Sequence, residues 1–197
     1  MCQGQLPQPD ELKEGINKVI IHRLPDDAWL SSPEGDFPER AIEQIEFRSS
    51  KIARIEDGFF SRLSGPNRLR KLTFQGVTSS AALDAKTLAG LGSSLNELKV
   101  VGKVDVDLNA VGNLSALTEL ALLNANASPM PEGFLASLPM LRVLEVVNSN
   151  LSTLPWSSLI QWANEDRTRG LRISNMVVDC DCRALVLAEQ DPALFTR

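Results

Sequence analysis

Large apolar residues recur along this chain in a short pattern, at the first, fourth and sixth positions of successive segments. There are seven such segments, six complete and one partial. The partial one, which is the last, has only Leu171 and Ile173, at its fourth and sixth positions. The segments begin 22 to 27 residues apart, so the chain is built from an internal repeat. The six complete segments have Ile16, Val19 and Ile21; Ile42, Ile45 and Phe47; Leu69, Leu72 and Phe74; Leu95, Leu98 and Val100; Leu117, Leu120 and Leu122; and Leu141, Leu144 and Val146.

The pattern predicts one short strand in each repeat. Side chains at the fourth and sixth positions of a strand point to the same face. The rest of each repeat must leave the strand and return, so that the next strand lies beside the first. One repeat cannot bury its apolar face alone, but stacked repeats bury a continuous core. The alternative is a helical domain with leucines at helical spacing, and six complete matches to the strand pattern disfavour it.

The remainder of each repeat predicts further inward residues and short helices. Segments 57–63 and 131–138 are interpreted as helical turns, with Phe60 and Phe134 pointing inward. Segment 153–170 predicts a longer helix that is capped by Ser or Thr and ends at its final glycine. Four more residues are expected to point inward: Ile52, Ile55, Leu151 and Leu154.

This repeat resembles that of the leucine-rich repeat proteins over roughly residues 16–176, as about seven repeats. The resemblance implies an α/β solenoid, with a curved parallel β-sheet on the concave face and short helices and loops on the convex face. One departure concerns the ninth position, where the family usually has Asn. Only its two serines can partly replace the amide, so less regular loops are expected. The column reads Leu24, Ser50, Val77, Lys103, Ala125, Ser149 and Met176.

Both ends resemble the cysteine-containing caps of the extracellular branch of this family. Residues 177–197 would begin a C-terminal cap, on the motif Cys180-Asp181-Cys182, and residues 1–15 would be the remnant of an N-terminal cap that ends in Cys2. The resemblance implies disulfide partners outside the chain, and hence a piece of a longer secreted protein or an incomplete gene model.

Free thiols in a cytosolic protein remain an alternative for the three cysteines. A zinc site is disfavoured because such a site needs about four ligands, and the single histidine, His22, lies far away in the first repeat. Three glycosylation sequons, at Asn113, Asn126 and Asn150, are compatible with secretion.

Composition and charge narrow the classes of partner. The chain is 43% hydrophobic and 23% charged, as in ordinary soluble proteins. Its net charge of -5 argues against nucleic acid and anionic membrane. A membrane-spanning helix needs about twenty apolar residues, and the longest apolar run is far shorter, so no membrane span is expected in this chain.

No catalytic constellation is found in the sequence. Phosphate-binding loops, zinc-protease motifs and nucleophile elbows are missing, so no enzymatic activity, metal or cofactor is predicted. Residues 105–112 imitate the start of a calcium loop, but Ala110 and Ala116 stand where that loop needs Gly and Glu. We therefore interpret this segment as a turn.

The outward strand positions predict a partner-binding surface in the fourth to sixth repeats. An apolar cluster with a charged rim is typical of a protein interface. The alternatives are scattered surface aliphatics, or a patch that is covered by a further C-terminal segment. The cluster comprises Val101, Ala121, Leu123, Val143 and Val147, with Lys99, Glu119 and Glu145 as its rim.

The sequence therefore predicts a secreted, non-enzymatic repeat module that binds a protein ligand or receptor through its concave face. One alternative is a non-catalytic subunit that stabilises an extracellular enzyme, since the Asn-poor repeats are similar to the repeat subunit of some luciferases. Another is an intracellular repeat adaptor.

Overall fold

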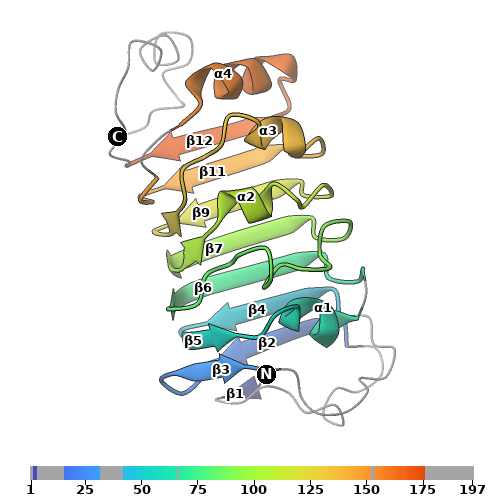
Figure 1. Cartoon of the computed structure of the whole chain (residues 1–197), viewed down its shortest axis with the longest axis vertical. Coiled ribbons are helices and arrows are strands. Elements are labelled where there is room, and N and C mark those ends of the chain that lie inside the picture. The colour runs from blue at the N-terminus through green and yellow to red at the C-terminus, as the bar shows by residue number, and fades with distance from the viewer. Residues whose placement is uncertain (1, 4–15, 32–41, 66, 152–153, 176–197) are drawn as a thin grey trace.

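A computed structural model of the chain describes residues 2–3, 16–31, 42–65, 67–151 and 154–175. Its largest sheet has ten strands, eight of which form one row, here called the main sheet, in the order β1-β2-β4-β6-β7-β9-β11-β12, and every neighbouring pair in the row is parallel (Figure 1). The other two strands, β3 (Ala28–Leu30) and β5 (Lys51–Ile55), join the row where β5 pairs with the end of β6. The strands of the row are β1 (Cys2–Gln3), β2 (Lys18–His22), β4 (Gln44–Arg48), β6 (Lys71–Ser79), β7 (Glu97–Lys103), β9 (Glu119–Leu123), β11 (Val143–Val147) and β12 (Gly170–Ser174).

The other wall of the molecule contains shorter strands and the helices. Two parallel pairs lie there, β3 with β5 and β8 with β10. Figure 1 shows all four helices on the same side of the main sheet, so the fold is a solenoid-like α/β coil. The elements are β3 (Ala28–Leu30), β5 (Lys51–Ile55), β8 (Asp105–Val106), β10 (Asn126–Ala127), α1 (Phe59–Ser64), α2 (Leu108–Val111), α3 (Phe134–Ser137) and α4 (Trp156–Glu165).

The strands stack without any shift in register at the apolar positions. The fourth positions of all seven repeats pair in one row, which runs from Val19 through Leu98 to Leu171. Every residue in this row is buried, as is every residue in the row of sixth positions, from Ile21 to Ile173. The predicted strands and their inward faces are thus confirmed. The first positions are also buried, except Ile16, which is partly buried.

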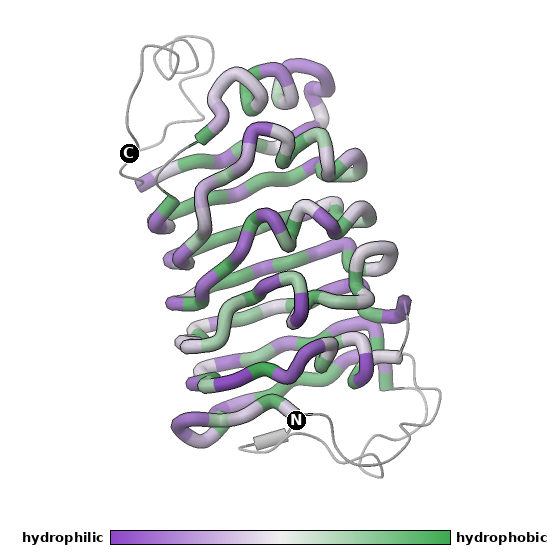
Figure 2. The backbone as a smooth tube through the Cα atoms, in the orientation of Figure 1, coloured by the Kyte–Doolittle hydropathy of each residue, from purple (hydrophilic) through white to green (hydrophobic). Residues whose placement is uncertain are grey.

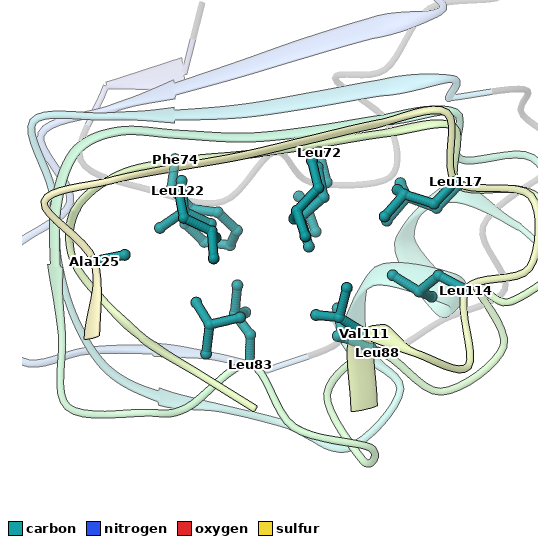
Figure 3. Packing of buried hydrophobic residues seen from close by; sticks show 14 of the residues in the cluster. Leu72, Phe74, Leu83, Leu88, Val111, Leu114, Leu117, Leu122 and Ala125 are labelled. Atoms are coloured by element: carbon teal, nitrogen blue, oxygen red, sulfur yellow. The ribbon is translucent and has the colours of Figure 1, made fainter. Parts of the chain in front are cut away.

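The core lies between the two walls of the coil. Figure 3 shows Leu72 and Phe74 of the sheet facing Leu83 and Val111 of the opposite wall. Phe60 and Phe134, which the sequence assigned to the core, are both buried and lie in short helices as predicted.

Four phenylalanines form a ring cluster in the N-terminal half of this core. Phe47 stacks on Phe74 with ring centroids 5.3 Å apart. Phe60 meets both rings edge-on, with centroids 6.3 Å from Phe47 and 6.1 Å from Phe74. Phe59 packs edge-on against Phe60 at 5.3 Å. In the later repeats leucine and valine replace these rings, for example Val100 and Leu122 at the sixth position.

The eighth position of every repeat has a positive backbone φ; it directly follows the strand in five repeats and lies within β6 and β7 in the other two. The backbone φ is between 45° and 64° at six of these positions and 140° at Gly102. Gly and Asn adopt this region at lowest cost, and they occupy five of the seven positions. The ninth position varies in residue type from repeat to repeat, whereas the eighth position has a positive backbone φ in every repeat. The seven residues are Arg23, Ser49, Gly76, Gly102, Asn124, Asn148 and Asn175.

Two serines at the ninth position connect neighbouring coils. The hydroxyl of Ser149 accepts a hydrogen bond from the backbone N–H of Ala125 at 3.2 Å and lies 3.1 Å from the carbonyl oxygens of Leu122 and Val147. The hydroxyl of Ser50 likewise accepts a hydrogen bond from the backbone N–H of Leu24 at 3.2 Å. Both serines are buried, and each hydroxyl links its own coil to the coil before it.

We expect Ser149→Ala to lower the free energy of unfolding by about 2 kcal/mol, because it leaves buried backbone groups of two coils without their hydroxyl partner. Urea unfolding followed by circular dichroism measures the effect. Ser93→Ala is the matched control, since that hydroxyl is exposed and bonds only the Asn67 side chain. Equal midpoints for the two variants would contradict this role.

The predicted helix over 153–170 is shorter than expected. Helix α4 spans Trp156–Glu165, and Gly170 begins β12 instead of ending the helix. The reason is a turn at Asp166, whose carboxylate accepts hydrogen bonds from the backbone N–H and the hydroxyl of Thr168, at 2.8 and 2.7 Å. No Ser or Thr side chain caps the start of the helix, where Pro155 stands.

The segment that imitates a calcium loop is also more ordered than a turn. Asp105 and Val106 form β8, which pairs with β10. The carboxylate of Asp107 then accepts a hydrogen bond from the backbone N–H of Asn109 at 3.0 Å and caps α2. The polar alternation in this segment therefore serves a strand and a helix cap.

The predicted caps lie largely outside the described residues. This holds for Cys180, Cys182 and all of 177–197, and for 1–15 except Cys2 and Gln3. Those two residues form β1, which pairs with Ile21 and His22 and thereby lengthens the sheet by one strand.

Candidate partner-binding surface

The side of the main sheet that faces away from the core is formed by the third, fifth and seventh positions of the repeats. We call it the open face. Figure 2 shows hydrophilic and hydrophobic residues alternating along these strands, as expected for a sheet with one buried side. In the fourth to sixth repeats this face contains Glu97, Lys99 and Val101; Glu119, Ala121 and Leu123; and Val143, Glu145 and Val147.

The N-terminal part of the open face is a network of ion pairs. The Glu46 carboxylate contacts the Arg48 guanidinium at 2.5 Å and the Lys18 amine at 3.2 Å. The hydrogen bond from Arg48 lowers the pKa of Glu46 despite partial burial, and Lys18 lowers it further. On the next strands Lys71 pairs with Glu97, which raises the pKa of the lysine. These groups satisfy one another and hold their charges at neutral pH.

Three apolar residues at the seventh position form a continuous row across β7, β9 and β11. Val101 pairs in register with Leu123, and Leu123 pairs with Val147. Adjacent strands are about 4.8 Å apart, so these side chains contact one another directly. All three are partly exposed. We call Val101, Leu123 and Val147 the apolar row.

Two other members of the predicted cluster do not belong to this row. The prediction that Ala121 is exposed is wrong, because its side chain is only 1% exposed. Its methyl group lies between the longer side chains of Lys99 and Glu145 on the flanking strands, which pair with it in register. Val143 is 38% exposed, but it lies four residues from Val147, about 13 Å along the strand. The predicted cluster is therefore a row plus a separate valine.

Two of the predicted rim residues, Lys99 and Glu145, lie two positions from the apolar row along their strands, whereas Glu119 lies at the other end of β9. Glu145 accepts a hydrogen bond from the exposed guanidinium of Arg172 at 2.8 Å. Among the described residues, Lys99 and Glu119 take part in none of the ion pairs found. Within the described part of the chain, the open face thus offers Lys99 as a positive group without an ion pair near the apolar row, and Glu119 as a negative group without an ion pair at the other end of β9.

Some of these contacts were missed from the sequence although a signal was present. Lys71 and Glu97 both occupy the third position of adjacent repeats, and Glu145 and Arg172 both occupy the fifth. Comparing neighbouring repeats column by column would have predicted both pairs, because residues at the same position become cross-strand neighbours.

The three sequon asparagines, Asn113, Asn126 and Asn150, are all exposed and lie off the open face. Asn126 donates a hydrogen bond from its amide to the Asp105 carboxylate at 2.9 Å. Asn126 and Asn150 are backbone neighbours on adjacent coils. All three sequons therefore lie outside the apolar row.

The described part of the chain contains no group of three or more His, Cys, Asp or Glu side chains arranged to hold a metal ion. His22 lies in β2, and its Nε2 atom is buried without a hydrogen-bond partner there. None of the described helices has the length and apolar character that crossing a membrane requires.

Comparison with known proteins adds no family to this description. No protein-family model matches the chain, and no curated protein matches it either.

Proposed function

We propose that this chain is a leucine-rich repeat module that binds a protein partner through its open face and performs no catalysis. The observation that carries the proposal is the apolar row, which is continuous over three strands and has charged side chains beside it. Apolar groups surrounded by charge are typical of protein interfaces.

The leucine-rich repeat assignment is supported by the repeat itself. Seven strands stack in register, their fourth and sixth positions are buried, and the eighth position of every repeat has a positive backbone φ. Ser50 and Ser149 tie adjacent coils at the position where the family places asparagine. In such a coil the outward sheet face is the broad regular surface that is open to a partner.

We further propose that the protein is secreted. The support is the resemblance of the segments around Cys2, Cys180 and Cys182 to extracellular caps, together with the exposure of the sequons at Asn113 and Asn150. Disulfides persist in oxidising compartments, where paired cap cysteines would be stable.

Substituting the centre of the apolar row tests the proposed function. We expect Leu123→Glu to weaken binding of the native protein partner at least about tenfold, because a buried unpaired carboxylate opposes docking. Affinity capture from the native source identifies the partner, and titration calorimetry measures the change in dissociation constant. Val147→Glu is expected to act in the same direction.

A matched control places the same charge away from the open face. Met140 is 52% exposed and lies before β11, outside the row. Met140→Glu should leave the affinity unchanged, and both variants should retain the circular dichroism spectrum of the parent. If Leu123→Glu folds and binds the partner as tightly as Met140→Glu, the open face is not the binding surface.

A further inference from the structure

At its fifth and seventh positions, the open face has the same arrangement of residues on both sides of β9. The apolar row is Val101, Leu123 and Val147, so that a valine flanks the central leucine on each neighbouring strand. At the fifth position the flanking residues are Lys99 on β7 and Glu145 on β11, which carry opposite charges at equal distances from β9. At these two positions the apolar residues are thus symmetric about β9 and the charges are antisymmetric, whereas the third position, with Glu97 on β7 and Val143 on β11, does not follow the pattern.

From this pattern we propose that the partner of the open face is a second copy of this chain, docked face to face about a twofold axis that runs along β9. This inference rests on the proposed binding function of the open face. The axis places β7 of one copy over β11 of the other. Leu123 then meets Leu123 of the second copy, and Val101 meets its Val147. Such self-complementarity is what a twofold interface requires.

The same axis also matches the charges. Lys99 of each copy faces Glu145 of the other, and this contact occurs twice. Lys99 has no ion pair among the described residues, so it is free to make one. Glu145 already accepts a hydrogen bond from Arg172 at 2.8 Å, but a carboxylate has capacity for further donors. Buried Ala121, between these charges, leaves room for the opposing side chains.

Two contacts oppose the pairing. Glu97, at the third position of β7, faces Val143 on β11 of the second copy, which places a charged group against an apolar one. Glu119 lies on β9 at the third position, so it faces Glu119 of the second copy across the axis. The two carboxylates lie at the opposite end of the strand from the apolar row, where water still reaches them. The dimer therefore forms with a repulsive contact at one edge. Removing the Glu119 charge should lower the dissociation constant of the dimer.

The size of the contact sets the strength of the dimer. Only the five strands from β6 to β12 overlap, which gives a sheet area of about 24 by 17 Å, or about 400 Å² per copy. A standard stable interface buries about 800 Å² per partner. The dimer is thus expected to be weak and reversible, with a population that depends on protein concentration.

Charge reversal at the two matched positions tests the inference. Sedimentation velocity is measured on the whole chain over an about hundredfold range of concentration, with a thiol reductant so that cysteines cannot cross-link the copies. The parent should show a concentration-dependent dimer. Lys99→Glu and Glu145→Lys should each raise its dissociation constant at least about tenfold. The variant with both changes should recover dimerisation.

Mixing the two single charge variants gives the sharpest test of the pairing. Lys99→Glu and Glu145→Lys, each monomeric alone, should form a heterodimer when combined, because both cross-copy pairs then regain opposite charges. Glu119→Gln should strengthen the parent dimer. The matched controls are Lys103→Glu and Glu132→Lys, which make the same changes at exposed positions off the open face and should leave dimerisation unchanged.

The outcomes separate this inference from the proposed function. A parent that stays monomeric throughout, or a dimer that the double variant and the mixture fail to restore, overturns the twofold pairing. If another protein still binds in a manner sensitive to Leu123→Glu, the binding function stands with a different partner. If neither self-association nor any Leu123-dependent binding is found, both proposals are wrong.

Discussion

Gly102→Ala should lower the free energy of unfolding by about 4 kcal/mol, which is exceptional for the addition of one methyl group. Gly102 has a φ of 140°, a conformation that residues with a side chain rarely adopt. A Cβ atom at this position would lie 2.1 Å from the carbonyl oxygen of Val77 and 2.8 Å from its backbone nitrogen. Both contacts are with backbone, so the methyl group displaces β6 or β7.

This site lies at an irregularity of the sheet. The register between β6 and β7 shifts after Gln75, so that Val77 rather than Gly76 pairs with Gly102. Urea denaturation measures the loss of stability, and the control is Gly133→Ala, because a Cβ there would meet nothing within 4 Å. We expect that control to stay within about 0.5 kcal/mol of the parent. A similar midpoint for both alanine variants would show that β6 and β7 can separate without cost.

Phe60→Ala should cost about 4 kcal/mol, the usual range for removing a fully buried aromatic ring. Phe60 is fully buried and lies edge-on against Phe47, Phe59 and Phe74. Its removal leaves a cavity between α1 and two strands of the main sheet, which α1 cannot close without leaving its place. Differential scanning calorimetry should show the melting temperature fall by about 10 °C in a chain of this length.

Two further variants at exposed and buried positions check the cause of that loss. Phe60→Leu keeps most of the volume and loses the ring contacts, so its cost should be well below that of Phe60→Ala. Met140→Ala removes a side chain that is 52% exposed and should have almost no effect. If Phe60→Leu is as damaging as Phe60→Ala, edge-on ring contacts rather than cavity volume dominate.

Much of the fold could be predicted because the repeat encodes it many times. Leu72, Leu98 and Leu120 each predict a strand at the same position of their repeats. Because the same pattern recurs in every repeat, it predicts the stacked row that these residues form. The short helices around Phe60 and Phe134 were also predicted, since a bulky residue recurs there at the same stage of a repeat. The repeat pattern does not encode where a helix stops, so the Asp166 turn that shortens α4 was missed.

The candidate surface was predicted less well because exposure depends on neighbours. Ala121 was assigned to the surface by its position in the strand, but its small side chain is hidden by Lys99 and Glu145. Val143 was grouped with Val147 because both are outward and apolar, although the strand keeps them at opposite ends. The position of a residue in the repeat predicts the side of the sheet to which its side chain points. Whether that side chain is buried also depends on the sizes of the side chains on the adjacent strands.

The in-register stacking of β2 to β12 has a consequence for how chains of this kind change in length. Each coil meets only the coil before it and the coil after it, through the same rows of apolar side chains. Deleting or duplicating one whole coil would therefore rejoin two matching surfaces, while an insertion of one residue within a strand would turn the inward side chains that follow it outward. Over evolutionary time, such a chain is free to grow or shrink by complete coils, and smaller changes in length are confined to the segments between the strands, as the spacing of 22 to 27 residues shows.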